Sequence, residues 1–439
     1  MLWLIYTENE VLEYVRENDV KFIRLAFCDL FGVQKNVSIT ASELLRAFAG
    51  GISFDASVVE GFLNADKSDL FLVPDPSTLA AMPWRPSRGG AASLICEVRH
   101  PDGSLFEGDS RALLKKACAR ADKMGYSCQI GPEYEFYLFE LDERSNPTRQ
   151  PIDRAGYMDI PPADRGENIR RDVCLTLEKM GIIPESFHHE SGPGQNEIDF
   201  RYTDALTAAD QFITFKGVVK EMAAQNGMYA SFMPKPLGGA AGSGLHINMS
   251  LARDGRNIFV GREHGHCAEA ESFIAGILSR VREITAFLNP TTNSYRRFGA
   301  FEAPQYVVWS HSNRAHLIRI PAADGEYTRM ELRSPDPTCN PYIAFALLVH
   351  AGLDGIEQGR PLPPAAAATP APEVLATYEK LPASLGEALD LAEQSAFVKR
   401  VLPQVTLQRF VAAKRREQAA LDHAEYKGKC EQQMYFERY

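Results

Sequence analysis

The segment 329–333, Arg-Met-Glu-Leu-Arg, constrains the fold more than any other part of the chain. In an extended strand, residues two apart share a face, so Arg329, Glu331 and Arg333 would project together while the two apolar residues pack behind them. Such a face can be an ordinary ladder of ion pairs. It can also be a binding site, because guanidinium groups bind carboxylate or phosphate oxygens and the carboxylate between them can coordinate a metal ion. The pattern predicts a strand and leaves both interpretations open.

Three upstream segments place polar side chains on a strand face in the same way. In the strand-like run 130–139, Glu133 and Glu135 stand two apart, and like charges in apolar surroundings repel unless a cation lies between them. The segment 188–197 predicts two short strands joined by a Gly/Pro turn, with an acid on each. The segment 242–250 alternates polar and apolar residues after glycines whose backbone N–H groups can approach an anion. The pooled candidate metal ligands are Glu133, Glu135, Glu190, Glu197, His246 and Glu331.

These five carboxylates and one imidazole indicate Mg²⁺ or Mn²⁺ and argue against structural zinc, which prefers Cys and His. Six protein groups are too many for one Mg²⁺ ion that keeps its waters, so we expect at least two ions. Several metal ions on a strand face with arginines close by are typical of phosphoryl transfer. In that chemistry, positioning and charge neutralisation carry most of the catalysis.

Length, composition and charge narrow the class of protein. The 439 residues suggest about two or three domains, and 45% hydrophobic residues suffice for a large core. No apolar run approaches the roughly 20 residues of a membrane span, and residues 1–6 lack the charge and length of a signal peptide, so we expect a cytoplasmic protein without membrane contact. The eight cysteines show no CxxC spacing, which favours reduced thiols. The net charge of −10 argues against a nucleic-acid-binding protein.

The order of helix and strand signals predicts an α+β protein of two domains, 1–105 and 106–439. The first combines alternating strands with a capping box at Thr7 and Glu10 and a short helix that ends at Gly50. The second alternates acid-bearing strands with helices, which predicts an antiparallel or mixed sheet backed by helices. Its helices are expected from Ser110 to Gly125 and near 164–180, 207–226, 268–285, 340–353, 384–395 and 406–423.

Two segments near the C-terminus stand out. Pro361–Pro372 is rich in Pro and Ala and is expected to be an exposed linker. The tail from Tyr426 is rich in Tyr and Phe, and we expect it to pack against a neighbouring chain.

Longer motifs give the chain a family resemblance. The most specific motif runs from Lys235-Pro236 through His246 to Ser250 and is similar to an ATP-region signature. From about residue 19 to about residue 359, the chain resembles glutamine synthetase of type I, the bacterial and archaeal kind. Further motifs that carry the resemblance are 54–57 (Phe-Asp-Ala-Ser), 289–295 (Asn-Pro-Thr-Thr-Asn-Ser-Tyr), 302–304 (Glu-Ala-Pro), 334–337 (Ser-Pro-Asp-Pro) and 340–342 (Asn-Pro-Tyr).

This resemblance implies a β-grasp-like N-terminal domain and a catalytic domain with a curved antiparallel sheet backed by helices, the glutamine synthetase/guanido kinase-like fold. It implies a homo-dodecamer of two stacked hexameric rings, with active sites between subunits. The implied reaction joins ammonia to L-glutamate at the expense of ATP, through a γ-glutamyl phosphate, and yields L-glutamine, ADP and phosphate.

The resemblance also implies a role for each candidate residue. One Mg²⁺ or Mn²⁺ ion near glutamate would be held by Glu135, Glu190 and Glu197, and another among the phosphates of the co-substrate ATP by Glu133, His246 and Glu331. Glutamate and ammonium would be bound by Glu135, Tyr157, Gly242, Arg297, Glu302 and Arg333. The nucleotide would be bound by Glu185, Tyr202, Asn248, Ser250, Arg314, Arg319 and Arg329. The implied catalytic residues are Asp55, which would take a proton from ammonium in the next subunit, Glu302 on a mobile flap, and Arg314 at the transferring phosphoryl group.

Three departures from the family pattern lie at the substrate end. Val58 stands where Ser is common, Ala241 stands where Asn is common, and the segment 297–302 is one residue shorter than the usual flap. A γ-glutamyl ligase that uses an organic amine, such as a polyamine, is therefore the first alternative. A non-catalytic structural relative is the second, but an inactive protein has no reason to keep such a cluster of negative charge.

Overall fold

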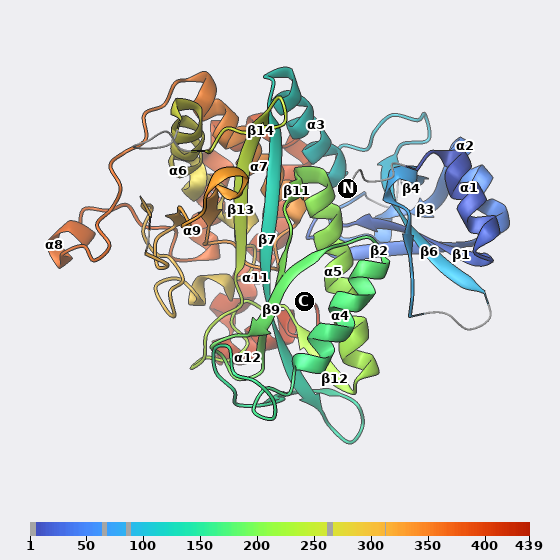
Figure 1. Ribbon diagram of the computed structural model, residues 1–439, viewed down its shortest axis with the longest axis horizontal. Coiled ribbons are helices and arrows are strands. Elements are labelled where there is room, and N and C mark those ends of the chain that lie inside the picture. The colour runs from blue at the N-terminus through green and yellow to red at the C-terminus, as the bar shows by residue number, and fades with distance from the viewer. Residues whose placement is uncertain (1–5, 64–67, 85–88, 261–266, 312) are drawn as a thin grey trace.

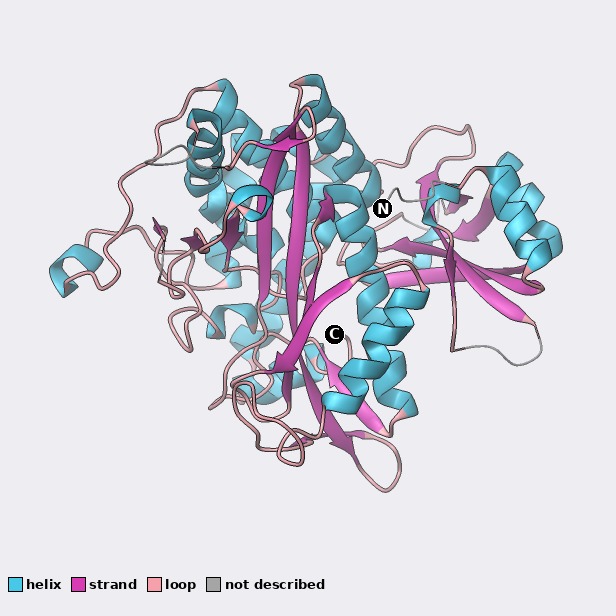
Figure 2. Ribbon diagram, in the orientation of Figure 1, coloured by secondary structure: helices cyan, strands magenta, loops and turns pink. Residues whose placement is uncertain are grey.

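The computed structural model describes residues 6–63, 68–84, 89–260, 267–311 and 313–439. These residues form a small sheet within 20–99 and a large sheet within 127–332. In Figure 1 the small sheet and its helices, in blue, lie to the right of the long central strands of the large sheet. Figure 2 shows helices flanking those strands, so the large sheet runs through the middle of the molecule.

The small sheet has the strand order β2-β1-β6-β4-β3, and β5 pairs with β6 beside this path. Its strands β1 and β6 are parallel, and the other pairs are antiparallel. The predicted capping box begins α1: the Thr7 hydroxyl accepts from the Glu10 N–H, and the Glu10 carboxylate accepts from the Thr7 N–H. The elements are α1 (Glu8–Glu17), β1 (Val20–Cys28), β2 (Gln34–Thr40), α2 (Leu44–Gly50), β3 (Ile52–Asp55), β4 (Asp69–Pro74), β5 (Ala80–Ala81) and β6 (Gly90–Arg99).

The large sheet has the order β15-β16-β17-β13-β7-β10-β9. Its longest strand, β7, has 15 residues and lies between β13 and β10. All pairs are antiparallel except β15 with β16, which confirms the predicted antiparallel or mixed sheet. The strands are β7 (Ser127–Leu141), β8 (Pro147–Pro151), β9 (Pro184–His189), β10 (Gln195–Phe200), β11 (Thr203–Asp204), β12 (Met228–Ser231), β13 (Leu245–Arg253), β14 (Arg256–Asn257), β15 (Trp309–Ser310), β16 (Ile318–Arg319) and β17 (Met330–Leu332).

Helices bury the apolar face of the large sheet, and those predicted in this region are confirmed. The rings of Tyr134 in β7 and Phe212 in α5 stack with their centroids 4.5 Å apart. Helices α6 and α7 cross closely because both carry glycine: a Cβ atom added at Gly355 would lie 2.0 Å from the Ser272 carbonyl oxygen. The helices are α3 (Ser110–Lys123), α4 (Glu167–Lys179), α5 (Ala205–Gln225), α6 (Ala268–Leu288) and α7 (Pro341–Glu357).

Buried ion pairs join the small sheet to these helices. Arg111 of α3 donates to Asp210 of α5 at 2.8 Å and to Asp75, after β4, at 2.9 Å. Lys115 lies 3.2 Å from the same Asp75 oxygen. A guanidinium group and a carboxylate from each side therefore fix how the two sheets sit relative to each other.

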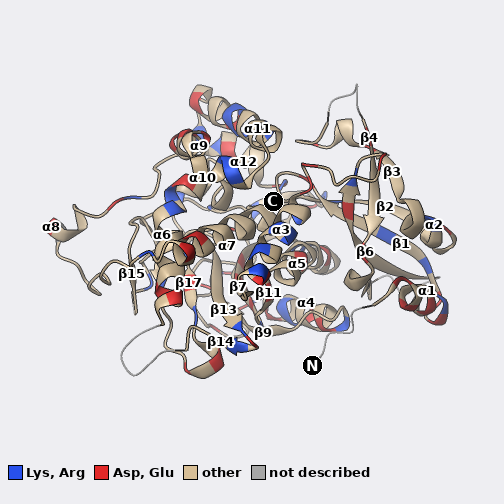
Figure 3. Ribbon diagram, turned by 90° about the horizontal axis from the view of Figure 1, so that it is seen from above, with Lys and Arg blue, Asp and Glu red and all other residues tan. Residues whose placement is uncertain are grey.

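The C-terminal region forms further helices on the side of α6 and α7. The segment before α8 is mostly exposed, as predicted for Pro361–Pro372, and Figure 1 shows α8 projecting from the body. Figure 3 shows basic and acidic residues interspersed on these helices, and Arg415 pairs with both Asp390 and Glu393. The helices are α8 (Pro372–Leu375), α9 (Leu385–Gln394), α10 (Ala396–Val401), α11 (Gln404–His423) and α12 (Lys427–Tyr435).

The expectation that the aromatic tail packs against a neighbouring chain is wrong for its last residues. Tyr435, Phe436 and Tyr439 are buried in the core of their own chain. The Phe436 ring lies edge-on to that of Phe139, with centroids 5.1 Å apart. The physical reason is that α12 folds back against the large sheet, where burial of three aromatic rings stabilises the tail on its own chain.

Among the residues that the structure describes, no helix combines the length and the apolar character needed to cross a membrane.

Candidate functional site

Strand register brings the predicted metal ligands onto one face of the large sheet. Because side chains alternate along a strand, directly opposed residues on neighbouring strands point to the same side. Their apolar neighbours in sequence point into the core, as the full burial of Leu245 and Ile247 shows. The opposed pairs are Glu133 with His246, Glu135 with Glu197, and Asn248 with Glu331.

His246 lies at the centre of the cluster. Its Nδ1 atom is 3.0 Å from a Glu133 oxygen and 3.7 Å from a Glu331 oxygen, while its Nε2 atom is 3.8 Å from a Glu135 oxygen. One imidazole therefore faces carboxylates on both ring nitrogens. Two groups of possible ligands meet at His246, each with its atoms within 4.8 Å of one another: Glu133, His246 and Glu331, and Glu135, Glu197 and His246.

Glu190 reaches this cluster by way of His188. Glu190 follows the end of β9, and its carboxylate lies 3.2 Å from the His188 Nε2 atom, which is 4.0 Å from Glu197. These three residues form a further group of possible ligands. The described structure thus divides Glu135, Glu190 and Glu197 between two groups that share Glu197. His188 is a neighbour of the site that is absent from the predicted set.

Burial and like charge make two of these carboxyl groups hard to ionise. Burial raises the pKa of Glu135, and the charge of Glu190 adds to the effect. Burial and the charge of Glu135 raise the pKa of Glu197 well above its ordinary value. Glu133 differs: burial opposes its ionisation, but His246, Asn248 and Arg333 together outweigh burial and lower the pKa of Glu133 to about 2.

This donor set fits a hard divalent cation. Its carboxylate oxygens and single imidazole suit Mg²⁺ or Mn²⁺, and a bound cation removes the repulsion that raises the pKa of Glu135 and Glu197.

The strand around Glu331 combines both interpretations of its charge pattern. Glu331 is buried and accepts hydrogen bonds from Arg319 of β16, at 2.8 Å, and from Arg333. Arg329 does not join this ladder, because its Nε atom donates to the Asn248 side chain at 2.9 Å. The ion pair with Arg333 is present, and Glu331 also stands within 3.7 Å of His246 among the possible metal ligands.

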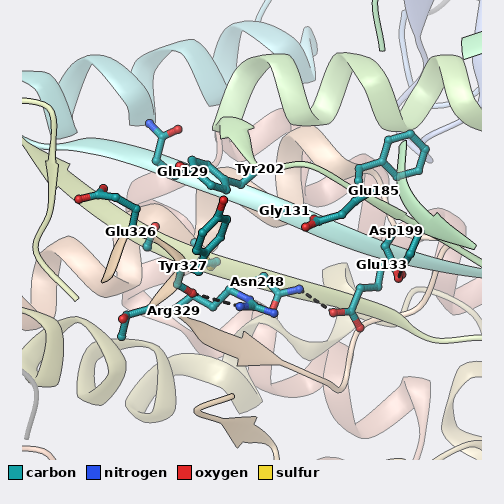
Figure 4. Close-up of a pocket in the computed structure, with 15 residues that line it drawn as sticks. Gln129, Gly131, Glu133, Glu185, Asp199, Tyr202, Asn248, Glu326, Tyr327 and Arg329 are labelled. Atoms are coloured by element: carbon teal, nitrogen blue, oxygen red, sulfur yellow. Dashed lines mark hydrogen bonds between the residues drawn. The ribbon is translucent and has the colours of Figure 1, made fainter. Parts of the chain in front are cut away.

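A cavity of about 370 Å³ lies beside the Glu133 end of the cluster. Figure 4 shows Glu133, Asn248 and Arg329 along one side of it, with hydrogen bonds from Arg329 to Asn248 and from Asn248 to Glu133. Five residues predicted to bind the nucleotide line it: Glu185, Tyr202, Asn248, Ser250 and Arg329. Arg314 and Arg319 are not among its lining residues, and Arg319 instead contacts Glu331.

On the opposite side of His246, a buried arginine lies among glycines. Arg297 is 3% exposed, and its guanidinium donates to the carbonyls of Ser334 and Pro335 at 3.0 and 3.2 Å. Its Nε atom has no hydrogen-bond partner within the described part of the chain. A Cβ atom at Gly242 would lie 2.6 Å from the Arg297 side chain, so only glycine allows this approach. Arg333, the second arginine predicted here, donates from Nε to the Arg314 carbonyl at 2.5 Å.

The residues predicted to bind ammonium come from separate places. Tyr157 is half-exposed and lies edge-on to His188, with ring centroids 5.2 Å apart, so it stands beside Glu190. Glu302 is exposed and, with Phe301, adopts positive φ (65° and 49°), a conformation that is costly for residues other than glycine. Asp55 ends β3 of the small sheet, which Figure 1 shows well to the right of the long strands β7 and β13, and its carboxylate accepts from Ser57. The chain does not bring Asp55 to its own cluster.

Besides His188, the acceptor Asp199 and the donor Gln195 are missing from the predicted set. Asp199 lies opposite Glu133, lines the cavity and has a pKa raised to about 6 by burial and by the charge of Glu133. Gln195 donates to Glu135 at 2.8 Å. Both lie two residues from Glu197, so period-two alternation along β10 was the signal that could have identified them.

Comparison with known proteins divides the chain as the two sheets do. A family model described as glutamine synthetase, beta-Grasp domain, matches residues 19–101, and one described as glutamine synthetase, catalytic domain, matches residues 107–435. The chain is 47% identical over 421 residues to glutamine synthetase of Clostridium saccharobutylicum, covering 94% of this chain and 95% of that one. It is 46% identical over 421 residues to glutamine synthetase of Methanosarcina mazei, covering 94% of each.

Solved structures share this fold over nearly the whole chain. A GmaS/ADP complex superposes with a TM-score of 0.87 at 29% identity, covering 97% of this chain and 98% of that one. Plasmodium falciparum glutamine synthetase superposes with a TM-score of 0.85 at 25% identity, covering 95% of this chain and 96% of that one.

Proposed function

This chain belongs to the glutamine synthetase family, and on that premise we propose that its site joins ammonia to the side-chain carboxylate of L-glutamate through a γ-glutamyl phosphate. It is a ligase of ATP-dependent glutamine synthesis, with the predicted β-grasp and catalytic domains. The observation that carries the proposal is the meeting of two ligand groups at His246 beside a cavity of about 370 Å³. Metal-binding groups and room for a nucleotide are therefore adjacent.

ATP would occupy this cavity. Glu185, Tyr202, Ser250 and Arg329 supply polar and aromatic contacts along it, and Asn248 links Arg329 to Glu133. The phosphates would extend toward Glu133 and Glu331. Arg314 and Arg319 would contact the transferring phosphoryl group, and the contact between Arg319 and Glu331 supports this for Arg319.

Two Mg²⁺ or Mn²⁺ ions would be held by the cluster. Glu133, His246 and Glu331 would bind one ion, and Glu135 and Glu197 with Glu190 would bind the other. When bound, the ions reduce the repulsion between the glutamate carboxylate and the ATP phosphates and stabilise charge on the transferring group.

The protein would hold glutamate at the glycine-lined end of the cluster. The buried guanidinium groups of Arg297 and Arg333 lie there, and glycine at 242 allows the Arg297 side chain to pack directly against the loop. A side-chain oxygen of glutamate attacks the γ-phosphorus of ATP, and the bond from that phosphorus to the ADP oxygen breaks. The acyl phosphate formed has the leaving group that a free carboxylate lacks.

Ammonia would complete the reaction. Ammonium loses a proton to Asp55 of a neighbouring subunit, because the chain's own Asp55 is distant from its cluster. The nitrogen lone pair then attacks the carbonyl carbon, and phosphate leaves with the electrons of the C–O bond and with one proton from the nitrogen, so a neutral amide remains. Tyr157, Glu190 and Glu302 would surround the ammonium ion. A homo-dodecamer of two stacked hexameric rings would place Asp55 in this way.

A second candidate acceptor is an organic amine. Val58, three residues after Asp55, is 80% exposed and presents an apolar side chain near the group proposed to receive the proton. An alkyl amine gains from such a contact and ammonium does not.

The deciding experiment measures phosphate released from ATP and L-glutamate with ammonium, methylamine, ethanolamine or putrescine as the acceptor. Ammonium should give the highest kcat/KM. A higher value for any amine would replace ammonia by that amine, and no release with any acceptor would overturn the proposal.

A further inference from the structure

The C-terminal tail 431–439 lies against the two loops that lead into the proposed glutamate site. The Tyr439 carbonyl accepts from the Phe232 N–H at 2.9 Å, and the Phe436 carbonyl accepts from the Ser231 hydroxyl at 3.1 Å. These bonds fix the segment that continues through Pro234 to the glycine loop at 238–244. On its other side, the tail meets the loop 291–297, where the Tyr435 hydroxyl accepts from the Thr292 N–H at 3.3 Å.

Glu431 is the charged residue at this junction. It is 2% exposed and forms an ion pair with Arg296, whose Nε atom lies 2.7 Å away. Its carboxylate also accepts hydrogen bonds from Asn293 Nδ2 at 3.0 Å and Thr292 Oγ1 at 3.3 Å. A buried carboxylate is stable only when its oxygens are paired, and here all three partners belong to one loop. In that loop, Arg297 directly follows Arg296.

Asn293 carries the contact across to the second loop. Its side-chain oxygen accepts from the Lys235 N–H at 2.7 Å, and its amide donates to the Lys235 carbonyl at 3.2 Å. The Lys235 ammonium group donates to the Ala240 carbonyl at 2.5 Å and lies 4.4 Å from the centre of the Phe301 ring. Phe301 has positive φ and precedes Glu302. A continuous set of contacts therefore runs from the tail to the segment that contains Glu302.

We propose that Glu431 is a positioning residue for glutamate: it fixes the loop that carries Arg297 and, through Asn293 and Lys235, the segment of Phe301 and Glu302. This inference rests on the proposed function, which assigns Arg297 and Gly242 to glutamate. Nothing in the contact set reaches the nucleotide cavity. Loss of the Glu431 carboxylate should therefore weaken glutamate binding and leave nucleotide binding unchanged.

The test compares Glu431→Gln with Glu437→Gln, an exposed glutamate of the same tail. A glutamine at 431 has no charge to pair with Arg296, and it has one acceptor oxygen where the carboxylate has two, so its NH₂ group faces a donor and the loop must shift. In Glu431→Gln the KM for glutamate should rise about tenfold, equivalent to about 1.4 kcal/mol. The KM for ATP should stay constant, kcat should change less than the KM for glutamate, and Glu437→Gln should match the wild type.

A second variant tests the proposal even if Glu431→Gln does not fold. Arg296→Gln removes the same ion pair from its half-exposed partner and should raise the KM for glutamate in the same selective way. Calorimetric titration of glutamate with ADP present separates this inference from the proposed function, since it needs no turnover. Equal increases in the KM values for glutamate and ATP, or a lower melting temperature with an unchanged glutamate affinity, would reduce Glu431 to a structural role and overturn the proposal.

Discussion

Gly242→Ala tests the proposed glutamate site most directly. The added Cβ atom would lie 2.5 Å from the Pro234 carbonyl oxygen and 2.6 Å from Arg297 Cγ, roughly 1 Å less than an ordinary contact. The Pro234 carbonyl belongs to the backbone and accepts from the Ser243 N–H at 2.8 Å, so the side that yields is the Arg297 side chain. Overpacking of this kind costs about 1–3 kcal/mol of stability.

The expected effect on activity follows from that displacement. Misplacement of a substrate-binding group by about 1 Å can lower kcat/KM by about 100-fold, close to 2.7 kcal/mol in transition-state stabilisation. We therefore expect kcat/KM for glutamate to fall by about this factor in Gly242→Ala. The dissociation constant for ADP should not change, because Gly242 does not line the nucleotide cavity.

The matched control is Gly239→Ala in the same loop. A Cβ atom at Gly239 meets nothing within 4 Å, so this variant should keep the wild-type kcat/KM for glutamate. Wild-type kinetics in Gly242→Ala, or an equal loss in both variants, would refute the reasoning that Gly242 exists to admit Arg297 beside glutamate.

Three further perturbations test other parts of the molecule. Glu331→Ala should abolish ADP formation in Mg²⁺ while circular dichroism shows a folded chain, because it removes a proposed metal ligand; retained turnover would contradict the two-ion assignment. Asp55→Ala should slow glutamine formation more than formation of the acyl phosphate, measured as ADP released in a single turnover, and equal slowing would contradict its role as proton acceptor. Asp75→Asn should lower stability to urea. Burial opposes ionisation of Asp75, but Arg111 and other partners hold the pKa of Asp75 below its ordinary 3.8. The contribution of the Asp75 carboxylate to the free energy of unfolding is therefore present above pH 3.8 and is lost as pH falls through the lower, folded-state pKa. The difference in the free energy of unfolding between variant and wild type should stay constant between pH 5 and 7 and shrink below pH 3.8; a difference that grows on acidification would contradict this.

Local patterns predicted much of the fold because they act over a few residues. The capping box at Thr7 and Glu10 satisfies helix N–H groups within one turn, so the sequence alone identifies the start of α1. Alternation along 245–250 places Leu245 and Ile247 in the core, as the structure confirms. Contacts between segments that are distant in sequence were not predictable in this way. The aromatic tail is the example: its rings need an apolar surface, and the pattern does not say whether that surface belongs to the same chain or to another.

The sequence by itself determined the family, the strand faces and the chemical nature of the site, because carboxylate and imidazole side chains carry their ligand chemistry wherever the chain places them. Only the tertiary structure decided which of these groups meet. Strand register sets Glu133 opposite His246 and places Asp199 in the lining of the cavity. Glu190 contacts His188, so it belongs to a different group of possible ligands from Glu135. Folding also brings Glu431, at the start of the tail, to Thr292, Asn293 and Arg296. The physical reason is that distances of about 3 Å between residues far apart in sequence depend on the packing of the whole chain, whereas the face of a strand depends only on its backbone.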